Sequence, residues 1–409
     1  MKLDLASLNF TTLATSPTAY ECYAELRATH PVLWSEQMRA WVLTRYSEVE
    51  PLLKDPRLIA FRPAPAVMPP AAVQPQLAYL EELHAGRFFR IDPPAHTRLR
   101  KLVNEGFTPS RVQKLQPQIT GMAHQLIDQV VEQGQMEVAG SFAYPLPVLV
   151  IAALLGLPTD LFAQMAAWSK TLLLFFGAQY VQAGYPPAQV NAIYQMHKEM
   201  EDYLRTVIEE KRRRPQDDLI SALITSDSDA PLSDRELISL CIVLLFAGHE
   251  TTMNTICNGL WALLRHPDQQ QKMAELPALI PAAVEEMLRY DAPVQFSKRT
   301  AATDFALGEV AIRAGDVLWL GLGAANRDPT QFPEPDCLRV TRSPNRHLAF
   351  GTGIHFCLGA PLARLEGQIA FRVLGERLRG LQLTHEPSLR QHSLFRGVEE
   401  LQVTWQASK

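Results

Sequence analysis

The sequence predicts a mainly α-helical protein, because helical patterns cover far more of it than strand patterns do. Residues 111–214 are mainly helical in pattern, and one long helix is expected from Ser233 until Pro267 forces it to stop. Strand-like alternation is clearest around residue 40, where VLW and AWVLTR flank the polar turn SEQMR and predict a β-hairpin. The sequence has no repeats and no low-complexity linkers, so we expect residues 1–409 to form one domain.

Composition argues against several classes of protein. The chain has 409 residues, of which 47% are hydrophobic and 20% are charged, enough for a large core. Its 39 basic and 43 acidic residues give a formal net charge of −4, so no basic excess indicates binding to nucleic acid. The cysteines are odd in number, widely spaced and without a CxxC pair, which argues against disulfide bonds and zinc sites and fits a reducing cytoplasm. They are Cys22, Cys241, Cys257, Cys337 and Cys357.

Hydropathy predicts a protein without a membrane span. The first residues carry Asp4 and no apolar run of the length that a signal peptide needs. The longest apolar stretch runs from Leu237 to Gly248, about a dozen residues, and is interrupted by Ser239. That length is typical of a buried core helix.

Three segments before residue 190 have recognisable local patterns. Residues 47–50 (SEVE) form a capping box, which predicts a helix that stops at Asp55-Pro56. Residues 144–158 predict a buried helix between prolines. Residues 171–187 are unusually apolar, with expected breaks at Gly177 and Gly184.

A helix is also expected after the double proline in DPPAHTRLR. His96 and Arg100 are four residues apart and therefore lie on one face of it. A surface histidine and arginine that bind nothing are the default interpretation of such a pair.

The long helix carries Ala247-Gly248-His249-Glu250-Thr251-Thr252 in its middle. Its Ser233 and Glu236 form a capping box at the start. An acid and an alcohol inside an apolar helix need a reason, because burying polar groups without partners is costly. One reason would be an internal bend in which Thr251 bonds back to a carbonyl.

Cys357 stands between a glycine-containing loop and a predicted helix. Gly351 and Gly353 precede it, and apolar residues at helical spacing follow it, with Pro361 near the helix start, where proline is tolerated. Amide donors and the helix dipole stabilise a thiolate at such a position, which would make it a nucleophile or a metal ligand. The alternative is a small buried hydrophobic residue.

The segment from Phe350 to Gly359, FGTGIHFCLG, resembles the haem-binding loop of the cytochrome P450 family, FGxGxHxCxG, at every specified position. The resemblance implies haem b, with its iron held by the Cys357 thiolate, whose sulfur pushes electron density onto the iron and favours O–O cleavage. The loop residues that it implies around the cofactor are Phe350, Gly351, His355 and Gly359.

Two segments earlier in the chain resemble the same family. DPPAHTRLR is similar to its DPPxHTRLR segment, which implies that His96 and Arg100 hold a haem propionate. AGHETT is similar to its AGxETT, which implies that Ala247 and Gly248 leave room for dioxygen. Glu250 and Thr251 would then help to deliver the two protons that cleavage of the O–O bond consumes.

Further residues take structural or cofactor roles by the same resemblance. Glu286 and Arg289 form an ExxR pair, which any surface helix can supply, but its order and distance before the cysteine loop resemble the family's pair. Its partner would be Arg342, and the three would hold the loop rather than act in catalysis. Arg299, on an expected strand, resembles the second propionate arginine, with Lys298 as an adjacent competitor. Leu338 and Arg339 depart from the family's usual Phe and Asp, and His355 is a further propionate candidate.

The resemblance, which includes EMLR and NRDP, covers nearly the whole chain in the family's order. It implies a mainly α fold with a smaller β-rich lobe and haem between the long helix and the cysteine loop. It also marks the chain as the soluble bacterial type, which is cytoplasmic. The loops that decide the substrate, residues 62–91, 171–187 and 392–396, match no motif.

The function implied is a haem-thiolate monooxygenase. It would insert one atom of O₂ into an apolar small molecule, by hydroxylation or epoxidation, in the biosynthesis of a secondary metabolite such as a polyketide or terpenoid. The alternatives are a fatty-acid hydroxylase, a peroxide-driven peroxygenase and a non-enzymatic haem protein that binds a gas. An intact Glu250-Thr251 pair argues against the last two.

Electrons must come from a partner, because the chain has no flavin or iron–sulfur motif. We expect a ferredoxin and a ferredoxin reductase, with NAD(P)H as the electron source. A group of cations suggests that the ferredoxin is acidic. These cations are Arg98, Arg100, Lys101, Arg111, Lys114 and Arg364.

Overall fold

The computed structural model describes residues 5, 8–60, 70–158, 161–178, 186–226, 230–391 and 395–406. The chain forms two compact units. Unit 1 comprises the described parts of Met1–Phe61, Gln116–Leu146 and Thr251–Lys409, and unit 2 those of Arg62–Leu115 and Pro147–Glu250. The expectation of a single domain over residues 1–409 stays a prediction.

Helices dominate the described residues, as predicted, and strands are confined to small sheets. The α-helices are α1 (Phe10–Leu13), α2 (Ala19–Thr29), α3 (Tyr46–Leu52), α4 (Gln74–Leu83), α5 (Ala95–Asn104), α6 (Pro109–Lys114), α7 (Gln116–Asp128), α8 (Pro145–Leu155), α9 (Phe162–Ala178), α10 (Pro187–Arg213), α11 (Leu219–Ile224), α12 (Asp234–Ala247), α13 (Glu250–Leu264), α14 (Pro267–Glu275), α15 (Ile280–Tyr290), α16 (Leu322–Ala325) and α17 (Ala360–Arg377). Short 3₁₀ or π segments are η1 (Ala71–Val73), η2 (Phe88–Arg90), η3 (Glu105–Phe107), η4 (Val131–Gln133), η5 (Ala139–Ala143), η7 (Pro277–Leu279) and η8 (Gly353–His355).

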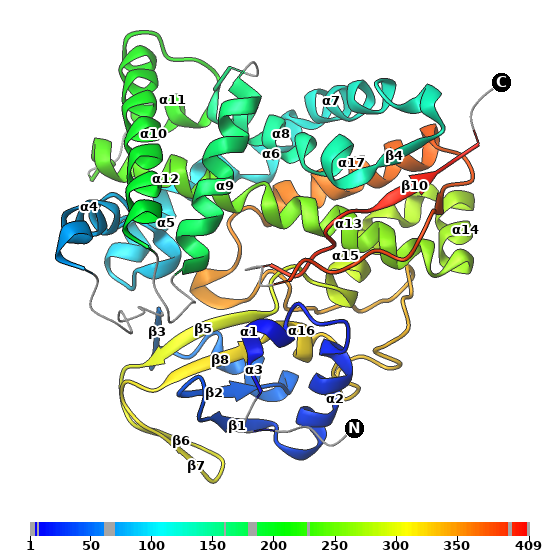
Figure 1. Ribbon diagram of the computed structural model, residues 1–409, viewed down its shortest axis with the longest axis horizontal. Helices are drawn as coiled ribbons and strands as arrows, with labels where there is room; N and C mark the ends of the chain where they lie inside the picture. The colour runs from blue at the N-terminus through cyan, green and yellow to red at the C-terminus, as the bar shows by residue number, and fades with distance from the viewer. Residues whose placement is uncertain are drawn as a thin grey trace. The chain divides into compact units, whose positions relative to one another are not determined.

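A five-stranded sheet in the order β1-β2-β8-β5-β3 lies in unit 1 (Figure 1). The predicted hairpin is confirmed, because β1 and β2 pair antiparallel with Val32 opposite Leu43. Side chains of one face, such as Leu318 and Leu320, pack into a buried apolar cluster with helix α3. The strands are β1 (Val32–Ser35), β2 (Ala40–Leu43), β3 (Leu58–Ala60), β4 (Gln135–Glu137), β5 (Phe296–Ala301), β6 (Phe305–Leu307), β7 (Val310–Ile312), β8 (Val317–Gly321), β9 (Gln382–Leu383) and β10 (Gln402–Thr404).

The helical part of unit 1 is built on α17, which packs against α7 and α15. The packing is tight at Gly259 of α13, where a Cβ would lie 2.9 Å from both the Met287 sulfur and the Phe371 ring. Helix α15 carries Glu286 and Arg289, and α17 follows the cysteine loop directly. This packing therefore fixes the two elements that frame Cys357.

Unit 2 is organised around the long helix α10, which contacts α4, α9, α11 and α12. Figure 1 shows α9, α10 and α12 running close together. The predicted buried helix within 144–158 is confirmed as α8. The stretch from Asp234 to Leu264 is long and apolar enough to cross a membrane, but 78% of its most apolar window is buried inside the protein. It is a core helix pair, as the sequence predicted for Leu237 to Gly248.

Three local predictions are wrong. Helix α3 begins one residue before Ser47, ends at Leu52 and has no side-chain cap, because the Ser47 hydroxyl bonds to Glu48 instead. The single long helix is two helices, α12 and α13, separated by Gly248 and His249, although its capping box at Ser233 is confirmed. Helix α9 continues through Gly177 to Ala178, since glycine is tolerated within a helix, and Gly184 lies outside the described residues.

Candidate active site

The loop around Cys357 has the geometry that its glycines predicted. Gly351 and Gly353 have φ angles of 65° and 75°, a region of backbone space that favours glycine. The Cys357 amide donates to the Phe350 carbonyl at 2.9 Å and closes the loop. Gly359 caps helix α17, with Pro361 in its first turn, so the predicted position of Cys357 just before a helix N-terminus is confirmed.

The loop leaves space beside two of its glycines and exposes apolar side chains, as a loop that contacts a cofactor would. A Cβ added to Gly351 or Gly359 would meet no atom within 4 Å. Two apolar side chains of the loop, Ile354 and Phe356, are 53% and 37% exposed. Cys357 is itself only partly buried, whereas burial raises the pKa of the Cys241 thiol to about 12. The loop therefore offers a soft sulfur ligand beside apolar surface, the donor chemistry that haem iron takes.

Glu286 is the centre of a charge network that holds the segment before the cysteine loop. Arg289 binds it through two hydrogen bonds of 2.8 Å, and the Arg342 Nε lies 3.1 Å from both of its oxygens. The predicted contact between Arg342 and Glu286 is therefore present. Arg289 also donates to the carbonyls of Pro335 and Cys337, so the network ties α15 to residues 335–342.

Two further donors to Glu286 were missed by sequence reasoning. They are the Arg339 backbone amide, 2.9 Å away, and the Asn345 side chain, 3.1 Å away. Arg339 bonds to Glu286 through its backbone amide, which any residue could supply, and its side chain forms an ion pair with Glu334. An arginine can therefore stand where the family usually has Asp. Leu338 is 2% exposed and fills its position as an apolar residue.

Glu285, adjacent to Glu286, was not predicted and connects three elements. It accepts from Arg364 of α17 at 2.7 and 2.8 Å and contacts His347 at 3.1 Å. Burial would raise its pKa, but the bonds to His347 and Arg364 outweigh that effect and lower the pKa to about 2. The Arg364 guanidinium also lies 4.6 Å from the centre of the Phe350 ring, so Glu285 steadies the first residue of the cysteine loop.

Arg299 lies on β5, as predicted, and is 8% exposed. Its guanidinium donates to the Ser297 hydroxyl at 2.9 Å and to the Lys298 carbonyl at 2.8 Å. The neighbouring Lys298 ammonium lies 3.5 Å from the centre of the Trp319 ring. Arg299 is thus held by short local bonds, while the competing cation is directed to an aromatic face.

In unit 2, His96 and Arg100 lie on helix α5, which begins after the double proline as predicted. His96 is 2% exposed, and burial, followed by the charge of Arg100, lowers the pKa of its imidazole. The side chain is therefore neutral at pH 7 and donates from one ring nitrogen only. Arg98 of the same helix forms an ion pair with Glu236 and donates a hydrogen bond to the Ala230 carbonyl.

The turn between α12 and α13 depends on Gly248. A Cβ there would lie 2.8 Å from the Leu244 carbonyl and 2.9 Å from Ile151 of α8, so the close approach requires glycine. Ala247 ends α12, and Glu250, 6% exposed, begins α13. Thr251 follows as the first residue of unit 1, and its carbonyl accepts from the Thr255 hydroxyl at 2.8 Å.

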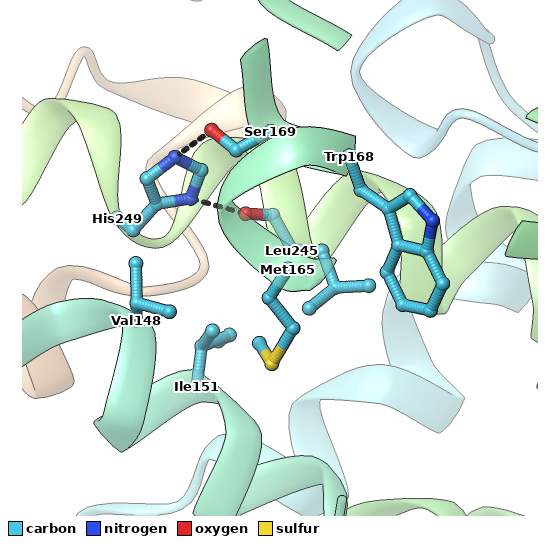
Figure 2. Close-up of a pocket in the computed structure, with 7 residues that line it drawn as sticks. All are labelled: Val148, Ile151, Met165, Trp168, Ser169, Leu245 and His249. Carbon is cyan, nitrogen blue, oxygen red and sulfur yellow. Dashed lines mark hydrogen bonds between the residues drawn. The ribbon is translucent and has the colours of Figure 1, made fainter. Parts of the chain in front are cut away.

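His249 is held by bonds at both ring nitrogens (Figure 2). Its Nδ1 bonds to the Leu245 carbonyl and its Nε2 to the Ser169 hydroxyl of α9. Burial lowers its pKa to about 4, so the ring is neutral, with the proton on Nδ1 and Ser169 donating to Nε2. Glu250 lies 3.8 Å from Nε2. The residues around the ring line a small cavity: Val148, Ile151, Met165, Trp168, Ser169 and Leu245.

The predicted site residues therefore fall into two sets. Unit 1 carries the cysteine loop, the Glu286 network that holds the segment before it, Arg299 and Thr251. Unit 2 carries His96, Arg100, Ala247, Gly248 and Glu250. Sequence reasoning missed Glu285, Asn345, Ser169 and the role of His249. For His249, the only signal was a polar residue at the variable position of a recognised motif.

The comparisons with known proteins agree with one family. A sequence profile described as Cytochrome P450 matches residues 33–379. The chain is 38% identical over 392 residues to the biotin biosynthesis cytochrome P450 of Bacillus subtilis, covering 95% of this chain and 96% of that protein. It is 38% identical to the 6-deoxyerythronolide B hydroxylase of Saccharopolyspora erythraea, covering 94% and 95% of the two chains.

Solved structures show the same fold. The chain matches P450BioI, crystallised with an acyl carrier protein carrying hexadec-9Z-enoic acid, with a TM-score of 0.87 and 37% identity, covering 97% of this chain and all of that one. It matches the myxobacterial CYP267B1, crystallised with myristic acid, with a TM-score of 0.83 and 36% identity, covering 97% and 98% of the two chains. Both the sequence and the fold are similar to bacterial haem-thiolate enzymes over nearly their full length.

Proposed function

Because this chain belongs to the cytochrome P450 family, we propose that Cys357 is the cysteine whose thiolate binds the haem iron. The protein is an oxidoreductase, a monooxygenase with haem as its cofactor. Bound haem supplies the iron at which O₂ is activated. The assignment rests on the position of Cys357 before α17, beside the open space at Gly351 and Gly359.

The haem propionates are proposed to bind His96, Arg100, Arg299 and His355. His96 supports this role because a neutral, buried imidazole can donate one hydrogen bond to a carboxylate without a large desolvation cost. Arg299 supports it because its short local bonds fix the direction of a nearly buried guanidinium.

Proton delivery is proposed for Glu250 and Thr251. Ala247 and Gly248 lie where α12 ends, and the resemblance to the family supports the proposal that these two small residues leave room for dioxygen. Glu250 is buried in the first turn of α13, where the helix dipole stabilises its carboxylate form. It can take up a proton from water and release it again through water, and the Thr251 hydroxyl can donate its own proton and be reprotonated along the same route.

The substrate class is proposed to be an apolar small molecule of secondary metabolism, such as a polyketide or terpenoid, which the enzyme hydroxylates or epoxidises. Relatives named for polyketide biosynthesis and for macrolide hydroxylation support this class. A fatty acid is the second candidate, supported by the two solved relatives that hold hexadec-9Z-enoic acid and myristic acid.

The electrons come from a redox partner, as the family requires. We propose a ferredoxin and its reductase, with NAD(P)H as the source, in the cytoplasm. Of the six cations expected to attract an acidic ferredoxin, Arg98 and Arg364 are already paired with Glu236 and Glu285. Arg100 is proposed above to bind a haem propionate, so the remaining candidates are Lys101, Arg111 and Lys114. Turnover with a ferredoxin that does not change with ionic strength would contradict an electrostatic docking site.

The first test is the difference spectrum of the reduced protein with carbon monoxide. The wild type should give the strongly red-shifted Soret band of a thiolate-ligated haem, and Cys357→Ser should lose it. Cys337→Ser is the matched control, because that cysteine is exposed and lies in the same segment of the chain. An unchanged band in Cys357→Ser would disprove the ligand assignment.

The proton route is tested with Thr251→Ala in a reconstituted system with a surrogate ferredoxin and reductase. Oxygen uptake should continue, but a larger share of the electrons should appear as hydrogen peroxide and less as oxidised product. Thr206→Ala, on the exposed face of α10, is the control. Equal coupling in Thr251→Ala and the control would exclude this threonine from the proton route.

A further inference from the structure

His249 is bonded differently from two other histidines that share its local geometry. In each of the three, Nδ1 bonds to the backbone carbonyl four residues earlier: His197 to Ile193, His249 to Leu245 and His266 to Ala262. The His197 ring packs at 5.1 Å on the buried His84 ring, and its Nε2 has no hydrogen-bond partner among the described residues. The Nε2 of His249 bonds to the Ser169 hydroxyl and lies 3.8 Å from the Glu250 carboxylate. What sets His249 apart is therefore its Nε2.

The bonds of the His249 ring leave one atom that can exchange a proton. A carbonyl oxygen only accepts, so Nδ1 keeps its proton and Nε2 is the nitrogen that can gain or lose one. In the neutral ring the Ser169 hydroxyl donates to Nε2, and a hydroxyl can equally accept from a protonated nitrogen. The same bond therefore holds the ring in both protonation states, which an alanine could not do and a threonine could.

The surroundings of the ring make its affinity for a proton depend on Glu250. Burial lowers the His249 pKa to about 4. Among the described residues that line the cavity beside the ring, α8, α9 and α12 contribute no carboxylate, ammonium or guanidinium group; these residues are Val148, Ile151, Met165, Trp168, Ser169 and Leu245. Glu250 of α13 is the titratable group at 3.8 Å. Its carboxylate stabilises a proton on Nε2 when ionised, so the ring becomes a better base once Glu250 has given up its own proton.

A cavity next to the ring has room for the molecule that would supply such a proton. Its volume is about 10 Å³, about the smallest that can hold one water molecule. Figure 2 shows Ser169 and His249 together at one side of it. The Ser169 oxygen has acceptor lone pairs, so it can receive a hydrogen bond from water while it donates to Nε2. Water, the Ser169 hydroxyl and the imidazole would then form a chain that ends at Glu250.

We propose that Ser169 and His249 relay a proton from a water molecule in this cavity to Glu250. The Ser169 hydroxyl gives its proton to Nε2 and takes one from the water, which brings it from solvent. The Nε2 proton then passes to the ionised Glu250 carboxylate, and the ring returns to its neutral form with the proton still on Nδ1. The 3.8 Å gap must shorten for this transfer, as catalytic contacts commonly do when substrate binds. The inference rests on the proposed role of Glu250 and adds two positioning residues that reload it.

The first test follows the His249 ring directly and needs no turnover. Protein with isotope-labelled histidine is titrated by nitrogen NMR in its reduced, carbon monoxide-bound form, and the spectrum of His249→Phe identifies the signal. In Glu250→Gln the ring should take up its proton at a pH lower by about one unit or more, because the amide lacks the stabilising negative charge. The His266 signal should not change. Identical His249 titrations in wild type and Glu250→Gln would overturn the proposal.

The second test measures coupling in the reconstituted system with a surrogate ferredoxin and reductase. In Ser169→Ala and His249→Phe, the share of electrons that appears as hydrogen peroxide should rise about twofold or more, and the solvent isotope effect on product formation should increase. Both changes should grow as the pH is raised, because protons become scarcer. Ser169→Thr keeps the hydroxyl and should behave as the wild type.

Two controls separate the relay from packing. Thr171→Ala removes a hydroxyl from the exposed face of the same helix, and His266→Phe removes an imidazole with the same bond to the carbonyl four residues earlier. Neither should change the peroxide share. Thermal unfolding of every variant reports packing defects, which would lower stability without altering the isotope effect or its pH dependence.

The outcomes separate the inference from the proposed function. More peroxide in Thr251→Ala, with none added in Ser169→Ala and His249→Phe, would overturn the relay and leave the proposed proton route. An equal rise in Ser169→Thr and Ser169→Ala would also overturn the relay, because the hydroxyl would then matter only for packing. If Thr251→Ala stays fully coupled, the proposed proton route fails, while a lowered His249 titration in Glu250→Gln would still support proton transfer between His249 and Glu250.

Discussion

Glu286 in unit 1 and the His84–His197 pair in unit 2 are equally buried but differ in how their polar atoms are satisfied. Glu286 receives bonds from Arg289, Arg342, Asn345 and a backbone amide. Within the described part of the chain, His84 has no hydrogen-bond partner for either nitrogen. Folding alone therefore gives the Glu286 carboxylate its hydrogen bonds, but it gives the His84 nitrogens none among the described residues.

The difference separates a buried group that fixes a geometry from buried groups whose hydrogen bonds are not made within the chain. A buried charge that is fully bonded by its own chain contributes to a single fixed geometry, which is what a loop presenting a metal ligand requires. Buried groups with unused bonds lower the stability of the free protein and regain that energy when a ligand arrives. Substituting Glu286 should therefore lower the unfolding free energy of the protein, and substituting His84 should not.

The largest effect is expected for Glu286→Gln. It would leave the buried guanidiniums of Arg289 and Arg342 without their counter-ion, which typically costs about 3–5 kcal/mol of unfolding free energy. Urea denaturation followed by circular dichroism measures it. Glu209→Gln, which removes a 3.8 Å surface pair with Arg213, should change stability by less than about 1 kcal/mol. Similar values for the two variants would refute the scaffold role.

Glu285→Gln should lower stability at pH 7 by an amount on the order of 3 kcal/mol, because the folded pKa is about 2 against an ordinary 4.5. A lowered folded pKa contributes stability above the ordinary value, and that contribution is lost as pH falls toward 2. The gap between wild type and variant should therefore narrow from about pH 5 downward. If urea denaturation gives the same difference in unfolding free energy between wild type and variant at neutral and at low pH, the stabilisation does not come from the charge of Glu285.

His84→Phe should leave the unfolding free energy of the ligand-free protein unchanged or raise it by about 1–2 kcal/mol, because an apolar ring replaces unpaired buried nitrogens. Thermal unfolding of the purified, ligand-free protein measures this. A marked loss of stability would mean that the nitrogens are satisfied in the free protein, and the contrast with Glu286 would fail.

Ser169→Ala tests a satisfied bond inside unit 2 and should lower stability by about 1 kcal/mol, since the His249 Nε2 loses its donor. Thr171→Ala, on the exposed face of the same helix, is the control. If both substitutions are equally mild, the Ser169 bond contributes no more than a surface hydroxyl.

The sequence predicted those parts of the molecule that local rules determine. The helix after the double proline, the hairpin and the Ser233 cap follow from proline, alternation and a capping box, and they are present. The helix predicted near Ser47 is present as α3, but its predicted capping box is not, because the serine hydroxyl bonds to its neighbouring carboxylate instead of the backbone.

Features that depend on distant partners could not be read from the chain. The break at Gly248 arises where Ile151 of α8 approaches too closely for a side chain, and His249 is held by Ser169, 80 residues earlier. Arg342 was found only because a motif pointed to it, whereas Asn345 and Glu285 match no motif and are visible only in the fold. The His84–His197 contact likewise joins the end of α4 to α10, and nothing in the sequence links these two helices.

The bond from Ser169 to His249 also ties helix α9 to the turn between α12 and α13. Helix α9 carries Phe175 and Phe176, which pack against His84, and Ser169 lies less than two turns before them. The His249 imidazole in turn lies 3.8 Å from the Glu250 carboxylate. A single hydrogen bond therefore connects the aromatic side of α9 to the neighbour of a residue proposed to deliver protons, so a shift of this helix along its axis would move the imidazole beside Glu250.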